Sequence, residues 1–402
     1  MKHLTAWALT LLLLLSAVPG GFCVSAESTE ADAYFQKLFQ RADVIGGAVL
    51  ISQGGKRVYT SCYGVEDRKT KVPVTEDTVY KVASVSKMIS AIGVMRLFDM
   101  GLIGLDDALP GIRNPRFPDV PVTLRQVMSH TSSLLSNAPY LTPPDWNQLS
   151  ETDTKYFSKY EPGMHYAYSN LNGGILCSVI ERVSGQSFNT FMAENVFSPL
   201  GINGAYAAHL LPDASRLATA YYTNKTVYRR GYQYVEIDAK EYDDTCDPSS
   251  HYRTSVGSLY ISLNGLEKLG QVLAGDGTAE GVQVLSDYAV RLMRLNQSLL
   301  PGSSVTSDSP YGLCVSHFTD QNGVTWYGHQ GRWEGLLTDL FFEPETQTVV
   351  VLVLDGVKAA NNGQGLHPRA EDALEYAGRW VREAESDSYV VKEEPEPGGH
   401  LN

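Results

Sequence analysis

The chain has 402 residues, of which 43% are hydrophobic, so it can bury a sizeable core in two or three domain-sized units or in one domain with a large insertion. It carries 45 acidic and 32 basic residues, which give a formal charge of −13. This acidic balance argues against nucleic acid and anionic membrane surfaces as partners, because both attract patches of Lys and Arg.

The first 26 residues have the pattern of an export signal. Lys2 gives a positive start, Ala6 to Val18 is an apolar, leucine-rich run, and Val24-Ser25-Ala26 offers small residues for cleavage. The apolar run is short for a transmembrane helix, although an uncleaved membrane anchor is the alternative. We therefore expect a secreted protein, with association to the cell envelope as an option and no stable membrane span after cleavage.

The cysteines and acidic residues give no sign of a metal site. Four cysteines remain after the predicted cleavage, far apart and without metal-ligand spacing: Cys62, Cys177, Cys246 and Cys314. We expect isolated, buried thiols, and a disulfide in an oxidising compartment is the alternative. No acidic cluster and no glycine-rich phosphate loop stands out, so we expect neither a metal nor a cofactor.

Hydrophobic periodicity and turn residues predict the elements of the chain in order. The first half contains a helix at 27–42, a β-hairpin at 45–63 that turns at Gly54-Gly55, a buried helix from Ser84 to Asp99, short helices at 123–130 and 173–184, and a polar, tyrosine-rich excursion without clear period at 216–252. The second half contains a helix at 258–274, strands at 313–318, 324–327, 336–342 and 348–354, a closing helix at 368–385, and an acidic tail at 386–402 that we expect to be disordered.

Strands therefore occur at both ends of the chain and helices in its middle. This order predicts an α+β fold in which one antiparallel sheet is built from both ends, flanked by helices, with a helical domain inserted. We assign residues 27–385 to one domain, with 27–105 and 255–385 as its α/β part and 106–254 as its helical part and excursion. A cleft between the two parts is the expected functional site.

Ser84 and Lys87 lie three residues apart at the start of the predicted buried helix, so they share one of its faces. A serine hydroxyl is a poor nucleophile until a base takes its proton, and a lysine held in a dry site can lose its own proton and act as that base. The free N–H groups of the helix start can also face an oxyanion. Alone the motif is weak, because Ser-x-x-Lys is frequent by chance and an ordinary surface turn explains it equally well.

Two further motifs strengthen this interpretation. Tyr168-Ser169-Asn170 opens a predicted helix, and His329-Gln330-Gly331 lies among the predicted carboxyl-terminal strands. With Ser84 and Lys87, these motifs make the chain resemble the serine β-lactamase and penicillin-binding-protein superfamily, especially its class C β-lactamase and D-Ala-D-Ala carboxypeptidase branch. The stretches 123–131 and 161–163 are also similar, and the resemblance covers roughly residues 30–385.

The resemblance implies a role for each motif residue. Ser84 would attack a carbonyl to form an acyl-enzyme, and Lys87 and Tyr168 would move the proton, with either of them as the base. Asn170 would hold Lys87 or a substrate amide. His329, where the family more often has lysine, would assist protonation of the leaving group or orient Tyr168, and it makes efficient β-lactamase activity doubtful.

The strand residues after His329 would bind the substrate. Gly331 would let substrate backbone approach the strand, Gln330 lies beside it, and the N–H of Arg332 would join that of Ser84 in an oxyanion hole. Each residue also has a structural alternative. Tyr168 and Trp333 can simply pack, His329 can be an ordinary strand histidine, the Arg332 side chain can bind a substrate carboxylate or be solvated, and His130 we interpret as structural.

We therefore expect an exported serine hydrolase of the β-lactamase/DD-peptidase fold. Its substrate would be a peptide, amide or ester, and the resemblance implies a D-Ala-D-Ala peptide of the cell wall. An esterase for small acyl esters or a weak β-lactamase of the same fold is the first alternative. A non-catalytic binding or sensor module that keeps the cleft is the second, and three intact motifs disfavour it.

Overall fold

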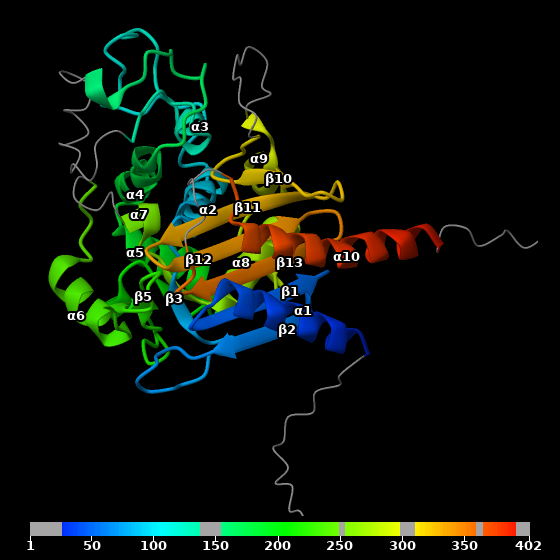
Figure 1. Cartoon of the computed structure of the whole chain (residues 1–402). Coiled ribbons are helices and arrows are strands. Elements are labelled where there is room, and N and C mark those ends of the chain that lie inside the picture. The colour runs from blue at the N-terminus through cyan, green and yellow to red at the C-terminus, as the bar shows by residue number, and fades with distance from the viewer. Residues whose placement is uncertain (1–25, 137–153, 249–253, 298–309, 359–364, 391–402) are drawn as a thin grey trace, which may run out of the picture.

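The computed structural model describes residues 26–136, 154–248, 254–297, 310–358 and 365–390. Its centre is a six-stranded antiparallel sheet in the order β10-β11-β12-β13-β1-β2 (Figure 1). These strands are β1 (Gly46–Gln53), β2 (Lys56–Gly64), β10 (Ser316–Thr319), β11 (Thr325–Trp333), β12 (Leu336–Glu343) and β13 (Thr348–Asp355). The pairing of β1 with β13 joins the two ends of the domain, which confirms the predicted α+β class and the antiparallel sheet built from both ends of the chain.

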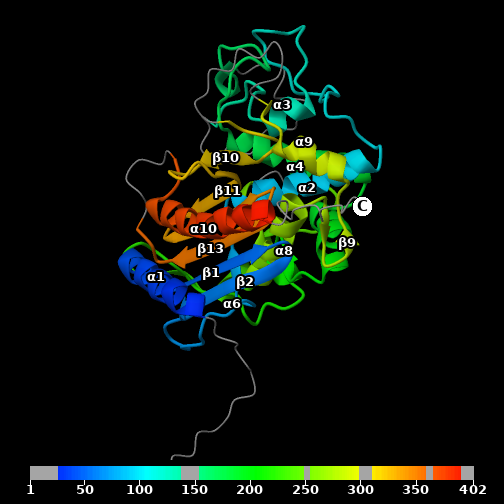
Figure 2. The same ribbon diagram turned by 90° about the vertical axis from the view of Figure 1, so that its right-hand side faces the viewer.

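The two faces of the sheet are covered by different helices, because side chains alternate along each strand. Ala48 and Leu50 pack into a large cluster with α2 (Val85–Asp99) and α8 (Leu263–Ala274). Val49 and Ile51 point the other way, toward α1 (Ala26–Ala42) and α10 (Pro368–Val390). Figure 2 shows α1 and α10 lying across that second face.

The remaining elements belong to the helical part and to small sheets beside it. The remaining helices of the described chain are α3 (Leu124–Met128), η2 (Thr154–Tyr156), α4 (Asn170–Ser184), α5 (Phe188–Met192), η3 (Ala193–Phe197), η4 (Ser198–Leu200), η5 (Ala208–Leu210), α6 (Gly231–Glu241), α7 (Thr254–Gly257) and α9 (Asp287–Arg294). The strands of the small sheets are β3 (Val79–Lys81), β4 (Gly204–Ala205), β5 (Ala220–Tyr221), β6 (Val227–Arg229), β7 (Tyr260–Ser262), β8 (Thr278–Ala279) and β9 (Val282–Gln283).

The small sheet β3-β7-β4 leads the chain into α2 and corrects one prediction. The helix predicted at 258–274 begins only at Leu263, because residues 260–262 form β7 between β3 and β4. Ser262 caps α8 by accepting a hydrogen bond from the N–H of Gly265 at 3.1 Å. A three-residue buried strand directly before a helix cannot be distinguished from the helix by hydrophobic periodicity.

Three further predictions from the sequence can be compared with the structure. The stretch 216–252 is not irregular throughout, since it contains the β5–β6 pair and helix α6. Helix α10 continues to Val390, so residues 386–390 are helical rather than part of a tail, as suits a stretch without Pro or Gly. Residues 1–25 and 391–402, which carry the predicted export signal and most of the predicted tail, lie outside the described residues.

The structure also bears on disulfides, metal sites and membrane spans. Cys62, Cys177, Cys246 and Cys314 form no disulfide, and Cys246 is exposed rather than buried. In the described ranges, no group of three His, Cys, Asp or Glu side chains is arranged to hold a metal ion. None of the helices described is both long and apolar enough to cross a bilayer.

Candidate functional site

The site begins at the tight turn that joins β3 to α2. Ala83 has φ of 46°, a left-handed conformation that is costly for a residue with a Cβ, and the helix starts directly after Ser84. Two contacts hold the turn: Val82 donates its N–H to the carbonyl of Leu259 at 2.9 Å, and Thr338 Oγ1 on β12 donates to the carbonyl of Val82 at 2.8 Å. Ser84 is thus fixed between the small sheet and the large one.

Lys87 lies one turn into α2 and is completely buried. Its Nζ is 2.9 Å from Ser84 Oγ and 2.8 Å from the carbonyl oxygen of Val256. Burial lowers the pKa of Lys87 from its usual value near 10.5 to about 7, because the ammonium loses its hydration. The amine can therefore be neutral near neutral pH while it is within hydrogen-bonding distance of the serine hydroxyl.

Two helices from the middle of the chain enclose the Lys87 side chain. A Cβ at Gly173 of α4 would lie 2.8 Å from Cε of Lys87, so only glycine leaves room for these methylene groups. Ser255 Oγ of α7 donates to the carbonyl of Gly173 at 2.7 Å, and the next residue supplies the Val256 carbonyl that accepts from Lys87. α2, α4 and α7 together form the dry pocket that lowers the pKa of this lysine.

Tyr168 contacts both members of the first motif. Its hydroxyl hydrogen bonds with Ser84, and Lys87 Nζ lies 5.4 Å from the centre of its ring. The residue is 40% exposed, but its hydroxyl points inward at Ser84, and desolvation of this group raises the pKa of Tyr168 above its usual value near 10. The phenol therefore keeps its proton near neutral pH and can donate it.

His329 lies on β11, and its ring centre is 6.1 Å from that of Tyr168. Burial lowers the pKa of His329 to about 3, and the charge of Lys87 adds to this effect, so the imidazole is neutral. Its Nδ1 lies 2.7 Å from the carbonyl oxygen of Gln330, which can only accept a hydrogen bond. Nδ1 therefore carries the hydrogen, and Nε2 can accept a proton or hydrogen bond but has none to donate.

Gly331 brings β11 against the start of α2. A Cβ at this position would lie 3.2 Å from Ser84 N and 2.2 Å from the carbonyl oxygen of Val82. The next N–H along the strand, that of Arg332, belongs to the segment that faces the nucleophile. Because β10 pairs with β11 only as far as Gly328, residues 329–333 leave that edge of the strand unpaired by β10.

The side chains of Gln330 and Arg332 point to the opposite face of β11, as strand alternation requires. Gln330 Nε2 donates to Asp339 at 2.7 Å, and Arg332 bonds with Gln330 at 2.5 Å and with the carbonyl of Gly365 at 2.9 Å. Burial raises the pKa of Asp339 to about 7. These contacts direct the Arg332 guanidinium away from Ser84, and its binding of a substrate carboxylate stays a prediction.

The structure separates the two asparagines at the start of α4. Asn170 is exposed, and its N–H bonds with Ser136 Oγ at 2.5 Å, whereas the described contacts of the Lys87 amine are to Ser84 and Val256. Asn172 is buried and accepts from Ser132 Oγ at 2.6 Å. The position expected of Asn170, beside Lys87, is thus not where its side chain lies; an exposed Asn170 can still reach a substrate.

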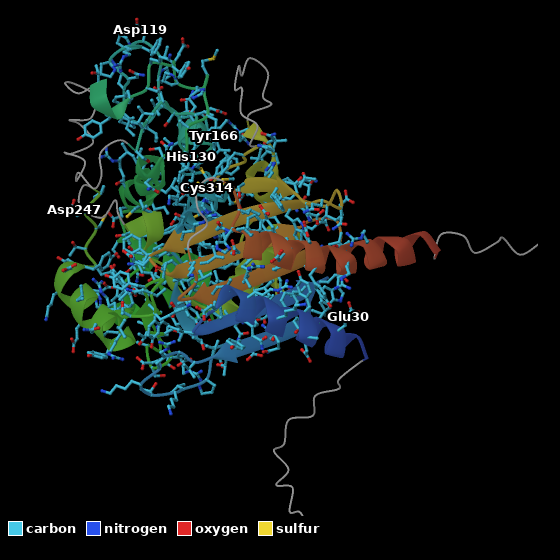
Figure 3. All side chains as sticks on the ribbon, viewed as in Figure 1. Glu30, Asp119, His130, Tyr166, Asp247 and Cys314 are labelled. Atoms are coloured by element: carbon cyan, nitrogen blue, oxygen red, sulfur yellow. The ribbon has the colours of Figure 1, made fainter. Side chains whose placement is uncertain are left out.

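Two residues that the motifs did not single out also lie at the site. His130 Nδ1 accepts from the N–H of Ser169 at 3.2 Å and from Asn172 Nδ2 at 3.1 Å, and the centre of its ring is 4.5 Å from that of Tyr168. Cys314 is buried close enough to Lys87 and Tyr168 to act on the pKa values of both. Figure 3 shows His130 and Cys314 close together between the helical part and the sheet.

Cys314 has no local signature, whereas His130 lies in the similar stretch 123–131 and is interpreted as structural on the sequence alone. Burial and the charge of Lys87 hold the pKa of His130 well below its usual value, and burial raises the pKa of the Cys314 thiol to about 12. Both residues also have positive φ, 57° for His130 and 55° for Cys314. Such backbone strain is concentrated at functional sites, but a sequence does not display it.

The comparison with known families agrees with this geometry. The sequence model of the family described as Beta-lactamase matches residues 31–375. The chain belongs to the Beta-lactamase family. The match confirms the superfamily that the three motifs predicted, and it covers nearly all of the described domain.

Three curated proteins illustrate which sequences this chain is similar to. Penicillin-binding protein 4* of Bacillus subtilis (strain 168) is 29% identical over 327 residues, which are 73% of this chain and 64% of that protein. D-alanyl-D-alanine-carboxypeptidase/endopeptidase AmpH of Escherichia coli (strain K12) is 29% identical over 187 residues, 42% and 47% of the two chains. Esterase EstB of Burkholderia gladioli is 27% identical over 248 residues, 56% and 62%. The aligned part spans less than two thirds of each of these curated relatives.

Solved structures support the fold. The octameric penicillin-binding protein homologue from Pyrococcus abyssi matches with a TM-score of 0.66 and 19% identity, covering 86% of this chain and 76% of that one. The D-amino acid amidase from Ochrobactrum anthropi SV3 matches with a TM-score of 0.63 and 20% identity, covering 88% and 99%. The predicted β-lactamase-like fold is therefore confirmed.

The contact between Gly173 and Lys87 gives a first prediction. We expect Gly173→Ala to displace the Lys87 amine and to slow acylation of Ser84 by at least about tenfold while the chain still folds, because small displacements at a reacting group cost large factors in rate. The rate at which a fluorescent penicillin or fluorophosphonate labels Ser84 measures this. Gly93→Ala is the matched control: its Cβ would meet Met192 and Ile180 rather than Lys87. Equal labelling rates in the two variants would contradict the prediction.

Proposed function

We propose that this chain is a serine hydrolase of the D-Ala-D-Ala carboxypeptidase or penicillin-binding type, which cleaves amides of D-amino-acid peptides through an acyl-serine intermediate. The observation that carries the proposal is the buried amine of Lys87, whose pKa is about 7 and which lies 2.9 Å from Ser84 Oγ. A neutral amine at that distance is a suitable base for the serine hydroxyl.

Acylation then follows from the contacts of Ser84. Oγ attacks the substrate carbonyl carbon while its proton passes to Lys87 Nζ, and the carbonyl oxygen takes up the negative charge. The N–H groups of Ser84 and Arg332, at the helix start and on the adjacent strand, are suited to stabilise that oxyanion. The unpaired edge of β11 at residues 329–333 supports binding of a substrate backbone as an added strand.

The leaving group needs a proton when the tetrahedral intermediate collapses. Tyr168 supports this step because its raised pKa keeps the hydroxyl protonated and because that hydroxyl bonds with Ser84. Lys87, once protonated, can replace the proton that Tyr168 gives. His329 has no hydrogen on Nε2, so we assign it the role of accepting from Tyr168 and orienting it rather than that of an acid. Water then hydrolyses the acyl-serine to release a carboxylic acid.

A second candidate of the same fold is an esterase for small acyl esters, which the similarity to Esterase EstB favours. A weak β-lactamase is a third outcome of the same chemistry, in which the acyl-serine formed from penicillin is hydrolysed quickly. A non-catalytic sensor module is disfavoured, because a lysine kept neutral beside a serine serves catalysis better than it serves stability.

The test of the proposal is to expose the protein to a fluorescent penicillin and to map the labelled residue by mass spectrometry. We expect the label on Ser84, its loss in Ser84→Ala, and a persistent adduct. Release of D-alanine from a D-Ala-D-Ala peptide, compared with turnover of a 4-nitrophenyl ester, then separates peptidase from esterase. Hydrolysis of the adduct within seconds would indicate a lactamase, and no label on any serine together with no turnover of either substrate would refute the proposal.

The pKa of Lys87 predicts how labelling of Ser84 depends on pH. Since this pKa is lowered to about 7, the neutral amine is scarce below pH 7 and dominates above it. We expect the second-order labelling rate to rise about tenfold per pH unit below 7 and to level off above it. If Tyr168 were the base, its raised pKa would move the rise above pH 10 instead. Lys87→Arg, which stays protonated, should abolish labelling.

Export is a further part of the proposal, and the pattern of Met1 to Ala26 supports it. A cell-wall peptide lies outside the cytoplasm, so a hydrolase that acts on it must be exported. We expect the mature chain recovered from culture medium or cell envelope to begin within a few residues of Glu27. Sequencing of the amino terminus after expression in a bacterial host checks this, and a cytoplasmic chain that keeps Met1 would refute it.

A further inference from the structure

A second cluster of side chains lies next to the site, at the end of β11, and has no part in the steps above. Its members are Lys81 of β3, Tyr228 and Arg229 of β6, Tyr234 of α6, Tyr260 of β7 and Trp333 of β11. Figure 1 shows β3, β5 and α6 together on the side of the molecule where this cluster lies. We call these six residues the cation–aromatic cluster.

The Lys81 ammonium is surrounded by three aromatic rings. Its Nζ lies 5.4 Å from the ring centre of Tyr260, 5.7 Å from that of Tyr234 and 5.9 Å from that of Trp333, distances at which a ring attracts a cation. Among the described residues it has no hydrogen bond or ion pair. Asp238 is the acid that acts on it and also on Tyr234 and Tyr260, and its carboxylate accepts the N–H of Ala208 at 2.7 Å.

Arg229 is a second cation on the same rings. Its guanidinium carbon lies 5.0 Å from the ring centre of Tyr234 and 5.4 Å from that of Tyr228. It too has no ion pair with any described residue, and its charge opposes protonation of Lys81. Two cations that share one tyrosine ring repel each other, and an anion bound between them would turn this repulsion into attraction.

Two hydrogen-bond donors of the cluster also lack an acceptor among the described residues. Tyr234 is 2% exposed, and its buried hydroxyl has no described hydrogen-bond partner. The buried indole N–H of Trp333 has no described partner either. Lysine, arginine and the indole N–H can only donate hydrogen bonds, and a tyrosine hydroxyl can donate one. Lys81, Arg229 and Trp333 are only partly buried, so a solute can reach them. A negatively charged group rich in acceptors, such as a carboxylate, would pair with the two cations.

The cluster lies further along the same strand, β11, whose Gly331 packs against the nucleophile Ser84. Gly331 lies against Ser84, and Trp333 is two residues further along β11 on the same face, which is about 7 Å in an extended strand. The residues that handle protons, Tyr168 and His329, lie at the other end of this edge. The leaving group must depart toward those residues, so the acyl part of the substrate extends toward Trp333.

We propose that the cation–aromatic cluster is a subsite for a carboxylate carried by the acyl part of the substrate, about two residues' length from the reacting carbonyl. This inference rests on the proposed function, because it assigns acyl and leaving group to the two ends of β11. It defines the substrate class more narrowly: amides or esters whose acyl part bears a free carboxylate are preferred to neutral ones.

The test compares two esters that differ only in that charge, the 4-nitrophenyl ester of adipic acid with a free second carboxylate and the same ester with that carboxylate methylated. We expect the wild-type chain to prefer the anionic ester in kcat/KM, and Lys81→Met to reduce the anionic-to-neutral ratio about tenfold, as the loss of one charge-assisted hydrogen bond does. Arg229→Gln, at a partly exposed position, should reduce the same ratio if Lys81→Met does not fold. Lys240→Met removes an exposed charge from the same helix as Tyr234 and should leave the ratio unchanged.

The outcomes separate this proposal from the function it rests on. A ratio that Lys81→Met and Arg229→Gln leave unchanged overturns the subsite while the hydrolase stands. If neither ester is turned over, penicillin labelling of Ser84 tests the proposed function, and calorimetric binding of adipate tests the subsite alone. We expect adipate to bind Ser84→Ala at least tenfold more tightly than it binds the same protein with Lys81→Met added, and equal binding would overturn the proposal.

Discussion

The buried amine of Lys87 is the constraint on which the rest of the site depends. A charged ammonium loses much of its hydration in such a pocket, so the pocket favours the neutral form and makes a base available near neutral pH. Keeping the pocket dry requires α2, α4 and α7 to meet, although Lys87 and its acceptor Val256 are 169 residues apart in the chain. The absence of a side chain at Gly173 lets α4 approach closely enough. The helical part thus supplies the dry environment, and the sheet supplies the second wall of the cleft.

Three titratable groups of the site, two of which contact Ser84, have pKa values moved in directions that separate their roles. Desolvation lowers the pKa of Lys87 to about 7, raises that of Tyr168 and lowers that of His329 to about 3. Near pH 7 the amine can accept a proton, the phenol can donate one, and the imidazole stays neutral. One physical cause, burial, therefore produces a base and an acid within reach of the same hydroxyl, because it always penalises the charged form.

The sequence predicts well what local geometry determines. Helix periodicity puts Ser84 and Lys87 on one face, and the turn at Gly54-Gly55 and the strand pattern before Glu343 give the hairpins of the sheet. The convergence of Tyr168 and His329 on Ser84 follows from resemblance and not from any local rule, and the positions of His130 and Cys314 depend on long-range packing that no motif encodes. Strand alternation, in contrast, would have shown that Gln330 and Arg332 face away from the nucleophile once Gly331 was placed against it. Helix α6 was missed because Arg230 gives no ordinary cap signal before it.

That alternation divides β11 into a face that anchors the strand and a face that performs chemistry. Gln330 and Arg332 bond with Asp339 and with the carbonyl of Gly365, and so hold the strand to β12 and to the chain that leads into α10. On the other face, His329 presents an imidazole, Gly331 lies against Ser84, and Trp333 presents an indole beside the Lys81 ammonium. A substrate lying along this edge meets proton-handling groups at one end and positive charge at the other. The direction in which it binds is therefore set by chemistry as well as by backbone hydrogen bonds, since the leaving group must lie where Tyr168 can give it a proton.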